Sequence, residues 1–441
     1  MVRFRAPRGM EDILPPKSGA MRRLEDSARK ILAAYGYEEI ILPVVEQAEL
    51  YLRSIGEETD IVQKEMFLLE DKGGRILALR PEATAGVARA FVEHGLDCAG
   101  LPVKLFYVGP MFRHERPQAG RYRQFHQLGV ELIGPAGPEA DAETILLVTE
   151  ILGEAGIPVE LRLNTVGDAL CRPSYLERLV AFLESRSDDL CEDCRRRMIR
   201  NPLRVLDCKE EGCREVLREA PLIHEYLCQD CRSHWEGLLD LLGQLGMKPT
   251  VDPLLVRGLD YYTRTVYELI SPELGAQNAV AAGGRYDDLI EEVGGRRTPA
   301  VGFSLGMERA LLLVRDGGRS RTGIYVISQA ESARREAFLL GAEFRRRGLR
   351  AEVDVMGRSF RAQLREADRR GFRYAAILGE DELEGGFLTL KDLESGEQRR
   401  ISREELLAGD RRGSLEAKGM TESHGEPGAA ETRRGGPESE V

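Results

Sequence analysis

The sequence of 441 residues contains no apolar run close to the roughly 20 residues that a membrane-spanning helix needs. Its beginning, MVRFRAPRGMEDILPP, is interrupted by Pro7, Gly9 and Pro15, so it lacks the apolar centre of a secretory signal peptide. Eight cysteines in a chain of this length that is not exported indicate reduced thiols or metal ligands rather than a disulfide framework. The sequence therefore predicts a cytoplasmic protein that does not associate with membranes.

Lysine is scarce, because arginine supplies all but nine of the 63 basic residues. The net charge is −11, which argues against nucleic acid coating the whole surface but leaves room for local basic patches. A hydrophobic content of 42% and a charged content of 31% describe an ordinary globular protein. Since arginine is common throughout the chain, an arginine is informative only where it belongs to a group of residues.

Residue patterning divides the chain into several parts of an α+β protein. Alternating, glycine-punctuated segments in 1–167 and 246–320 predict one large antiparallel sheet flanked by helices. Residues 168–245 read as a helical insertion that contains cysteines. Strand–helix alternation over 321–411 predicts an α/β module with a largely parallel sheet. Residues 412–441, which are rich in Gly, Glu, Arg and Ser and have no aromatics, predict a disordered tail.

The segment LRPEATAGVARA, residues 79–90, places a carboxylate at Glu82 and a hydroxyl at Thr84, with the small Ala83 between them leaving the backbone open. This pair suits the α-ammonium group of an amino acid, because a charge taken out of water must be paired and hydrogen-bonded. The alternative is that Glu82 and Thr84 only cap the start of a helix. Taken alone, capping is the more common use of such residues.

The segment FYVGPMFRHERPQAGRYRQFHQLGVELIG, residues 106–134, predicts a strand, a tight loop and a second strand. Arg113 leaves the first strand and Arg121 enters the second, and guanidinium groups at a hairpin mouth suit phosphate oxygens. Period-two alternation places Gln127 and Glu131 on one face of the second strand. The carboxylate of Glu131, deeper in the groove, suits a cationic or hydrogen-bonding side chain. The alternative, an exposed hairpin with solvated charges, is disfavoured by the apolar residues of both strands.

A third segment, VRGLDYYTRTVYELIS (256–271), places Arg257 in a glycine-containing turn before Tyr261, Tyr262 and a β-branched alternation. The later AAGGRYDDLI adds Tyr286 after a pair of glycines. An arginine beside aromatics on a strand rim suits an anionic group next to a flat, polar one. One of the adjacent tyrosines could instead be a core aromatic, because neighbours on a strand face opposite ways.

A fourth segment, AVGFSLGMERALLLV (300–314), predicts a glycine-rich strand that leads into a helix with Arg309 on its first turns. A guanidinium in this place suits a phosphate group, and an ordinary helix-surface charge is the alternative.

Together these segments resemble histidyl-tRNA synthetases. RGLDYYT is similar to the histidine-specific signature of that family, RHERPQ and GRYRQFHQ to its version of motif 2 of class II aminoacyl-tRNA synthetases, and AVGFSLGMERALLLV to motif 3. ILPVVEQAELYLRSIG, residues 41–56, resembles motif 1. The resemblance spans about residues 3–411 in the family's order. It implies a class II synthetase sheet flanked by helices, a helical insertion and a C-terminal α/β anticodon-binding domain.

The resemblance implies a histidine–tRNA ligase, in which ATP with Mg²⁺ activates L-histidine to histidyl-adenylate before transfer to the 3′ end of tRNA(His). It implies catalytic roles for Arg113 and Arg257, with Arg257 at the α-phosphate, where other class II enzymes use a metal ion. The implied histidine-binding residues are Glu82, Ala83, Thr84, Gln127, Glu131, Tyr261, Tyr262 and Tyr286. The implied ATP-binding residues are Arg113, Arg121, Arg257 and Arg309.

The resemblance also implies partners. The loop 114–121 would overhang the tRNA acceptor end, and Arg116 and Gln118 occupy the positions that read the extra 5′ guanosine of histidine tRNA. Motif 1 implies a homodimer, because its strand and helix expose an apolar face that a lone subunit cannot bury. In the C-terminal module, Arg358 and Arg361 stand where relatives often have lysine. RNA contact is expected there, and a solvated helix face is the alternative.

An alternative function is that of a catalytically inactive paralogue, a regulatory subunit of ATP phosphoribosyltransferase. Such subunits keep the class II core and the histidine site. They typically lack the RGLDYYT wording and the C-terminal module, and this sequence has both.

The insertion contains two CxxC pairs with two further cysteines between them: Cys191, Cys194, Cys208, Cys213, Cys228 and Cys231. Paired CxxC spacing is typical of structural zinc, since each pair can hold one tetrahedral metal through thiolates. The alternative is a set of reduced thiols, because the family resemblance implies no general metal requirement and six cysteines leave the ligand set ambiguous. On the sequence alone we assign no metal ligand.

Overall fold

The computed structural model describes residues 4–56, 59, 61–118, 120–314 and 321–410, so the predicted tail 412–441 lies outside the described residues. The chain divides into two compact units, residues 1–315 and 316–441. We describe each unit by itself.

An eight-stranded sheet forms the centre of the larger unit, with the strand order β1-β5-β6-β11-β10-β9-β7-β8. The strands are β1 (Glu38–Glu39), β5 (Val103–Phe112), β6 (Gln124–Ile133), β7 (Glu160–Thr165), β8 (Thr250–Val251), β9 (Thr263–Ile270), β10 (Ala279–Arg285) and β11 (Ala300–Gly306). The six inner strands pair antiparallel, while the short edge strands β1 and β8 pair parallel. The predicted antiparallel sheet is confirmed.

Helices cover one face of this sheet because strand alternation makes that face apolar. Leu128, Val130 and Leu132 of β6 point to the core that also contains the buried residues of α1 and α4. The helices are α1 (Lys17–Ala34), α4 (Pro138–Glu154) and α10 (Met307–Leu313). Pro138 at the first turn of α4 has a fixed φ that suits a helix start. In α1 the buried apolar side chains Met21, Leu24, Ala28 and Leu32 recur at helical spacing and face this core.

The opposite face of the sheet carries α3 (Thr84–Glu93) and α9 (Leu289–Glu292), which pack with Tyr107, Met111 and Tyr261 in a second core. A small three-stranded antiparallel sheet, ordered β2-β4-β3, adjoins α2 (Ala48–Ile55). Its strands are β2 (Val45–Gln47), β3 (Phe67–Glu70) and β4 (Ile76–Leu79). Strand β4 leads through a short turn into α3, so this small sheet sets the start of that helix.

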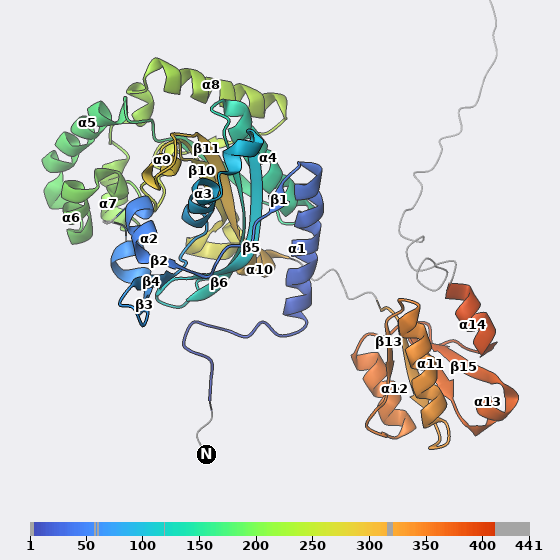
Figure 1. Ribbon diagram of the computed structural model, residues 1–441. Coiled ribbons are helices and arrows are strands. Elements are labelled where there is room, and N and C mark those ends of the chain that lie inside the picture. Colours follow the sequence, from blue (N-terminus) through green and yellow to red (C-terminus); the bar gives the residue numbers. More distant parts are fainter. Residues whose placement is uncertain (1–3, 57–58, 60, 119, 315–320, 411–441) are drawn as a thin grey trace, which may run out of the picture. The chain divides into compact units, whose positions relative to one another are not determined.

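The predicted insertion is helical; α5, α6 and α7 lie together at one side of the larger unit, and α8 runs across its top (Figure 1). They are α5 (Arg172–Ser185), α6 (Glu192–Arg200), α7 (Glu211–Leu217) and α8 (Gln229–Gln244). On α5 the buried side chains are Tyr175, Leu179 and Leu183, which recur at helical spacing. These residues join the core that runs under α4 and α8, so the insertion packs onto the sheet domain.

The smaller unit contains a five-stranded sheet with the order β13-β12-β14-β15-β16. Its elements are β12 (Ile324–Ser328), α11 (Arg334–Arg346), β13 (Ala351–Val353), α12 (Phe360–Arg369), β14 (Tyr374–Leu378), α13 (Glu380–Gly385), β15 (Phe387–Asp392), β16 (Gln398–Ser402) and α14 (Arg403–Asp410). Strands β13, β12 and β14 are parallel, whereas β15 and β16 are antiparallel, so the sheet is mixed rather than largely parallel. Strand β16, which alternates weakly, was missing from the sequence-based prediction.

No helix among the described residues is both long and apolar enough to cross a lipid bilayer.

Candidate functional site

A cavity of about 270 Å³ lies where the start of α3, the β5–β6 hairpin and the segment before β9 meet on the sheet. Of the predicted site residues, these line it: Glu82, Thr84, Arg113, Arg121, Gln127, Glu131, Arg257, Tyr261, Tyr262, Tyr286 and Arg309. Ala83, Arg116 and Gln118 do not belong to its wall. Four segments that are far apart in the sequence therefore contribute to one site.

Glu131 on β6 is the most buried carboxylate of the cavity, at 1% exposure. One carboxylate oxygen accepts a hydrogen bond from the Thr84 hydroxyl at 2.7 Å, and the other accepts one from the Tyr286 hydroxyl. Burial raises the pKa of Glu131 to about 8, although the Tyr286 and Thr84 hydroxyls act in the opposite direction. Gly302 pairs with Glu131 on the neighbouring strand, and a Cβ there would collide with the carboxylate. A glycine at this position is what leaves room for the acid.

Glu82 lies at the start of α3, where helix capping and ligand binding were the two alternatives. Its carboxylate accepts backbone N–H groups of Thr84 at 2.7 Å and Ala85 at 3.0 Å, so it satisfies donors in the first turn. Thr84 does not cap, because its hydroxyl donates to Glu131. Burial raises the pKa of Glu82. The capping interpretation thus holds for Glu82, while both side chains still line the cavity.

Arg80 fixes the turn between β4 and α3. Its buried guanidinium donates to the carbonyl oxygens of Pro110 at 2.9 Å, Leu42 at 3.0 Å and Pro43 at 3.3 Å. Three backbone acceptors held by one planar group define the path of the chain just before Glu82. Sequence patterning did not single out Arg80, although it directly precedes the PEAT segment.

The three predicted tyrosines form one aromatic wall. The rings of Tyr261 and Tyr262 lie 4.8 Å apart, and those of Tyr261 and Tyr286 lie 5.6 Å apart at a near-perpendicular angle. Both Tyr261 and Tyr262 line the cavity, because they precede β9, which starts at Thr263, and strand alternation does not apply to them. The ring of Tyr262 fills the space that a Cβ on Gly284 would take. The paired glycines of β10 therefore make room for aromatic rings.

Arg285 anchors the end of β10 just before Tyr286. Its side chain is fully buried and forms ion pairs with Asp141 of α4 and, at 3.1 Å, with Asp287. It also donates to the carbonyl oxygen of Pro135 at 3.0 Å. A buried charge with this number of partners has one stable position, which keeps Tyr286 over the cavity.

Arg113 and Arg121 flank a carboxylate that sequence reasoning missed. Glu115 lies 3.2 Å from Arg121 and 4.0 Å from Arg113. Arg113 also donates to the carbonyl oxygen of Pro81 at 2.9 Å and stacks over the ring of Phe125. The two guanidinium groups are held at the cavity with part of their charge balanced by a single acid.

Arg309, the third residue of α10, reaches back across the cavity rather than lying on a helix surface. It donates to the carbonyl oxygens of Gly120 at 2.9 Å and Ala279 at 2.8 Å. Burial lowers its pKa, and the nearby positive charge of Arg121 adds to that shift. A guanidinium remains charged even so, and this one bridges the hairpin loop and β10.

Arg257 forms an ion pair with Glu268 of β9, a partner that no local pattern indicates because eleven positions separate the two residues. Burial acts to lower the pKa of Arg257, but Glu268, Tyr262 and Asp207 together outweigh burial and the pKa is raised. The Nε of Arg257 is buried and has no hydrogen-bond partner among the described residues. The guanidinium is thus oriented by Glu268 and keeps one donor that is unpaired among the described residues.

The loop between β5 and β6 carries Arg116 and Gln118 outside the cavity. Both side chains are exposed. The backbone N–H of Gln118 donates to the carbonyl oxygen of Arg121 at 3.1 Å, and the N–H of Arg121 donates to the carbonyl oxygen of Gln118 at 2.9 Å. These two hydrogen bonds define the tip of the loop. The two residues are therefore placed beside the cavity and open to a large ligand.

Two further residues contribute to the wall without having been predicted. The Glu308 carboxylate accepts hydrogen bonds from the backbone N–H of His126 at 2.9 and 3.0 Å, and it lies 2.8 Å from the Nδ1 of the same residue. Ser304 contacts the hydroxyl of Tyr107 at 2.9 Å. Glu308 adjoins Arg309 in sequence, so its neighbour could have indicated it; no pattern marks Ser304 or Tyr107.

Among the residues that the structure describes, two side-chain groups outside this cavity could hold a metal ion. One consists of Cys191, Cys194, Cys208 and Cys213, and the other of Asp168, Cys171, Cys228 and Cys231. Both lie in the insertion. The six cysteines noted in the sequence thus separate into two groups, and Cys171 and Asp168 complete the second.

The chemistry of the main cavity is that of a site for an anionic, phosphate-bearing ligand next to a small polar one. Four arginines supply positive charge, while the inner end offers a carboxyl group, hydroxyls and aromatic faces.

Comparison with protein families gives two matches. A family model described as histidyl-tRNA synthetase matches residues 9–310, and one described as anticodon binding domain matches residues 323–409.

Individual relatives match over nearly the whole chain. The chain is 50% identical over 406 residues to the histidine–tRNA ligase of Aquifex aeolicus, covering 92% of this chain and 100% of the relative. It is 48% identical over 409 residues to that of Halothermothrix orenii, covering 91% and 98%. The solved structure of apo histidyl-tRNA synthetase from S. aureus matches with a TM-score of 0.77 at 33% identity, covering 92% of this chain and 99% of that one.

Proposed function

Because this chain belongs to the histidyl-tRNA synthetase family, we propose that the cavity beside α3 is the place where it holds histidine and ATP. The enzyme is a histidine–tRNA ligase, which activates L-histidine with ATP to histidyl-adenylate and then transfers the histidyl group to the 3′ end of tRNA. The observation that carries the site assignment is one cavity with four arginines at its mouth and a buried glutamate at its inner end.

Histidine occupies the inner end of the cavity in this proposal. Its imidazole lies between Glu131 and Tyr262, and its α-ammonium group faces Glu82, Thr84 and Gln127. The Oε1 of Gln127 is buried without a hydrogen-bond partner among the described residues, which is costly unless a ligand donates to it. The tyrosine rings complete the pocket, and the backbone at Ala83 sets the spacing between Glu82 and Thr84.

ATP occupies the arginine-rich mouth. Arg257 and Arg113 face the α-phosphate, while Arg121 and Arg309 hold the outer phosphates. A carboxylate oxygen of histidine attacks the α-phosphorus and the bond to the β-phosphate oxygen breaks, so that pyrophosphate leaves. The arginines stabilise the negative charge that develops on the phosphate oxygens. Glu115 and Glu308 in the wall have carboxylate oxygens, the ligands that Mg²⁺ prefers, and they would hold the ion that accompanies ATP and neutralises part of its phosphate charge.

The alternative of an inactive regulatory subunit is not favoured, because the curated relatives that match over about nine-tenths of the chain are named as ligases. Histidine-dependent exchange of pyrophosphate into ATP tests the proposed reaction directly. The purified protein should catalyse exchange without any tRNA. A protein that binds histidine but shows no exchange would be a binding subunit.

The exposed loop residues Arg116 and Gln118 are proposed to read the acceptor end of tRNA(His) with its extra 5′ guanosine. Arginine can contact guanine O6 and N7 together, and unpaired acceptor ends present such edges. We expect Arg116→Ala to lower aminoacylation of tRNA by about tenfold or more, which corresponds to the 1–3 kcal/mol of such a contact. Pyrophosphate exchange should change less than twofold, because it needs no tRNA.

The measurement compares steady-state aminoacylation of tRNA with and without the extra guanosine. The preference for the complete tRNA should shrink in the variant. An equal loss in exchange and aminoacylation would move Arg116 into the ATP site.

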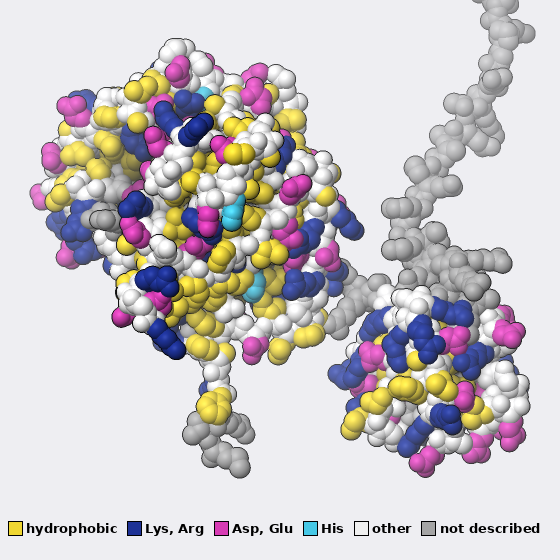
Figure 2. Space-filling view, viewed as in Figure 1, with side chains coloured by type: hydrophobic (Ala, Val, Ile, Leu, Met, Phe, Trp, Pro, Cys, Tyr) yellow, Lys and Arg dark blue, Asp and Glu magenta, His cyan; other side chains and the backbone are white. Residues whose placement is uncertain are grey.

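A homodimer is proposed from the small sheet. Strand alternation places Val45, Phe67, Leu69, Leu77 and Leu79 on one face of the sheet β2-β4-β3, and Leu69 is 47% exposed. None of these five side chains belongs to a core cluster of the described residues. The apolar side of α2, in contrast, packs inward through Tyr51 and Ile55. Figure 2 shows apolar side chains at the surface of this unit among charged ones.

We expect Leu69→Glu combined with Leu77→Glu to convert the dimer to monomers at micromolar concentration, because charges cannot be buried unpaired in an apolar contact. Sedimentation velocity measures the change. Leu245→Glu, at an exposed leucine outside this sheet, is the control and should leave the dimer intact. Wild-type protein that sediments as an active monomer would contradict the proposal.

The smaller unit is matched by the anticodon-binding model, and we propose that α12 contacts RNA there. Arg358 is engaged by Asp354 at 3.8 Å and Glu366 at 3.6 Å, whereas Arg361 is exposed and available for a phosphate. We propose that residues 1–167 and 246–320 form the catalytic domain, 168–245 the insertion and 321–411 the anticodon-binding domain. We also propose that the enzyme works in the cytoplasm.

A further inference from the structure

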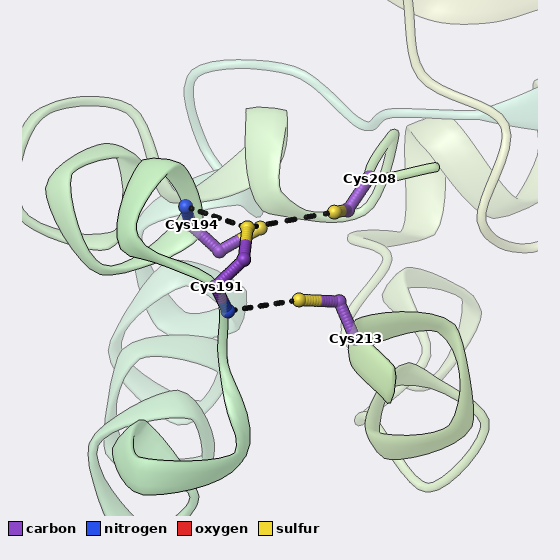
Figure 3. A group of neighbouring side chains, drawn as sticks. All are labelled: Cys191, Cys194, Cys208 and Cys213. Atoms are coloured by element: carbon purple, nitrogen blue, oxygen red, sulfur yellow. Dashed lines mark hydrogen bonds between the residues drawn. The ribbon is translucent and has the colours of Figure 1, made fainter. Parts of the chain in front are cut away.

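Four cysteine thiols of the insertion converge at one point. Cys191 and Cys194 come from the start of α6, Cys208 from the following loop and Cys213 from α7 (Figure 3). Their sulfur atoms all lie within 4.8 Å of one another. All four are free thiols rather than disulfides.

The spacing of these sulfurs suits a tetrahedral metal. Zinc bound by four thiolates at about 2.3 Å places neighbouring sulfurs about 3.8 Å apart. The Sγ atoms of Cys191 and Cys208 are 3.9 Å apart. A disulfide would need about 2.05 Å. The group therefore has the size of a metal site before any rearrangement.

The backbone around the thiols has the orientation that thiolates need. The N–H of Cys194 donates to the sulfur of Cys191 at 3.4 Å, and the N–H of Cys191 donates to the sulfur of Cys213 at 3.1 Å. Cys191 is also the N-cap of α6, where the helix dipole favours negative charge. Such N–H groups stabilise metal-bound sulfur as an outer layer of the site.

Helix α6 lacks the apolar side that normally docks a helix. Its sequence is EDCRRRMIR, and Cys194 is the only buried side chain of this fully described helix. Ile199 is 82% exposed. On α7 the buried residues are Cys213 and Leu217. Besides the cysteines, only Met198 of α6 and Val216 and Leu217 of α7 pack against the main core among the described residues. The cysteines are thus a large share of what these two short helices bury, and a metal bound to them would add the stability that a structural metal supplies in small domains.

We propose that Cys191, Cys194, Cys208 and Cys213 bind one structural Zn²⁺ as thiolates. Four sulfur ligands with no open position describe a structural rather than a catalytic site. Soft thiolates in a tetrahedron select zinc or iron, and zinc needs no redox partner.

The segment between Cys194 and Cys208 connects this site to the proposed ligase site, because it contacts the turn that carries Arg257. Asn201 on that stretch donates to Asp260 at 2.8 Å, and Arg204 lies 3.5 Å from the carbonyl oxygen of Arg257. The zinc ion holds both ends of the stretch that packs against the Arg257 turn. Metal removal should therefore loosen that turn as well as the insertion.

The group of Asp168, Cys171, Cys228 and Cys231 supports a second metal site on observations of its own. The sulfurs of Cys171 and Cys231 lie 3.8 Å apart, and Cys171 lies 3.4 Å from the nearer carboxylate oxygen of Asp168. Cys228 lies 3.9 Å from both oxygens of Asp168. Cys171 and Cys228 are the N-caps of α5 and α8, as Cys191 is of α6. We assign a second Zn²⁺ to this group.

Metal analysis of the full-length protein tests both assignments. Protein purified under reducing conditions should contain two zinc ions per chain by mass spectrometry. Cys213→Ser should remove one of them, and Cys231→Ser should remove the other. Cys98→Ser is the matched control, since Cys98 is exposed and outside both groups, and it should retain two. Replacement by Co²⁺ should give the absorption bands of tetrahedral cobalt–thiolate.

Each outcome decides an assignment. Wild-type protein without stoichiometric zinc, or with iron in its place, overturns the proposal whatever the variants do. A zinc content that Cys213→Ser leaves unchanged removes the first site, and one that Cys231→Ser leaves unchanged removes the second. In hydrogen exchange, chelation should speed exchange across 191–213 and 256–260 several-fold, and unchanged exchange there would refute the structural role. Ligase activity of a zinc-free protein would leave the family function intact.

Discussion

Arg257→Ala should slow formation of histidyl-adenylate by about a thousandfold, while histidine affinity changes by only a few-fold. A preorganised charge aimed at the reacting phosphate acts mainly on the transition state, and loss of one such group costs about 10²–10³ in rate. The ion pair with Glu268 orients the guanidinium before ATP arrives. Rapid-quench measurement of a single turnover reports the rate, and equilibrium binding of histidine reports the affinity.

Two variants accompany this measurement. Arg257→Lys keeps the charge but loses the planar donor set, so it should recover only part of the rate. Arg116→Ala, in the exposed loop, should adenylate at the wild-type rate. Unchanged single-turnover adenylation in Arg257→Ala would remove Arg257 from the reaction.

Glu131→Gln should weaken histidine binding by about 2–3 kcal/mol, or roughly 30- to 150-fold, because the imidazole draws the protonated Glu131 into its charged form on binding and an amide cannot make the charge-assisted hydrogen bond that results. Glutamine has nearly the same shape, but its single amide oxygen can accept from only one of the Thr84 and Tyr286 hydroxyls, because these donate to different oxygens of Glu131. Calorimetric titration with histidine measures the loss. Tyr286→Phe is the companion variant, which frees one carboxylate oxygen but keeps the ring. Wild-type affinity in Glu131→Gln would mean that histidine lies elsewhere.

The same residue makes stability depend on pH. Burial raises the pKa of Glu131 from 4.5 to about 8, so the folded protein keeps a proton that the unfolded chain has released. The contribution of Glu131 is therefore fully favourable below about pH 4.5. The contribution of Glu131 to the free energy of unfolding declines by at most about 1.4 kcal/mol per pH unit as the pH rises toward 8. Above about pH 8 this contribution no longer changes with pH.

Glu131→Gln has no such proton to lose. Between pH 5 and 8, without histidine, its free energy of unfolding should rise relative to that of the wild type. Chemical denaturation at several pH values measures the difference. A difference that stays constant with pH would show that Glu131 is ionised throughout this range.

Much of the fold followed from local patterns, because those patterns record which side of an element is buried. Alternation on β6 separated Leu128 and Val130 from Gln127 and Glu131, and the structure places them on opposite faces of the sheet. The mixed sheet of the smaller unit was harder to predict, because strand β16 has only one buried residue, Ile401, and so lacks a clear alternation. Whether two strands pair parallel or antiparallel also cannot be read from the local sequence.

The candidate site, like the fold, was predicted only in part from the sequence. Residues within compact motifs were found, because neighbours in the chain are neighbours in space. Partners across the fold were not, as with Glu268 for Arg257 and Asp141 for Arg285. The adjacent Tyr261 and Tyr262 also show the limit of strand periodicity, which says nothing of residues in the turn before a strand. The roles assigned to these residues stay predictions.

The short path from β4 to α3 has a consequence for cooperativity. Leu77 and Leu79 belong to the apolar face that we propose a partner subunit covers, and Glu82 follows within a few residues. Arg80 clamps this path onto three carbonyl groups, so it moves as one piece. Subunit association and histidine binding would then be thermodynamically linked, and linkage is reciprocal. Histidine should tighten the dimer, and dilution below its dissociation constant should lower the affinity of each subunit for the amino acid.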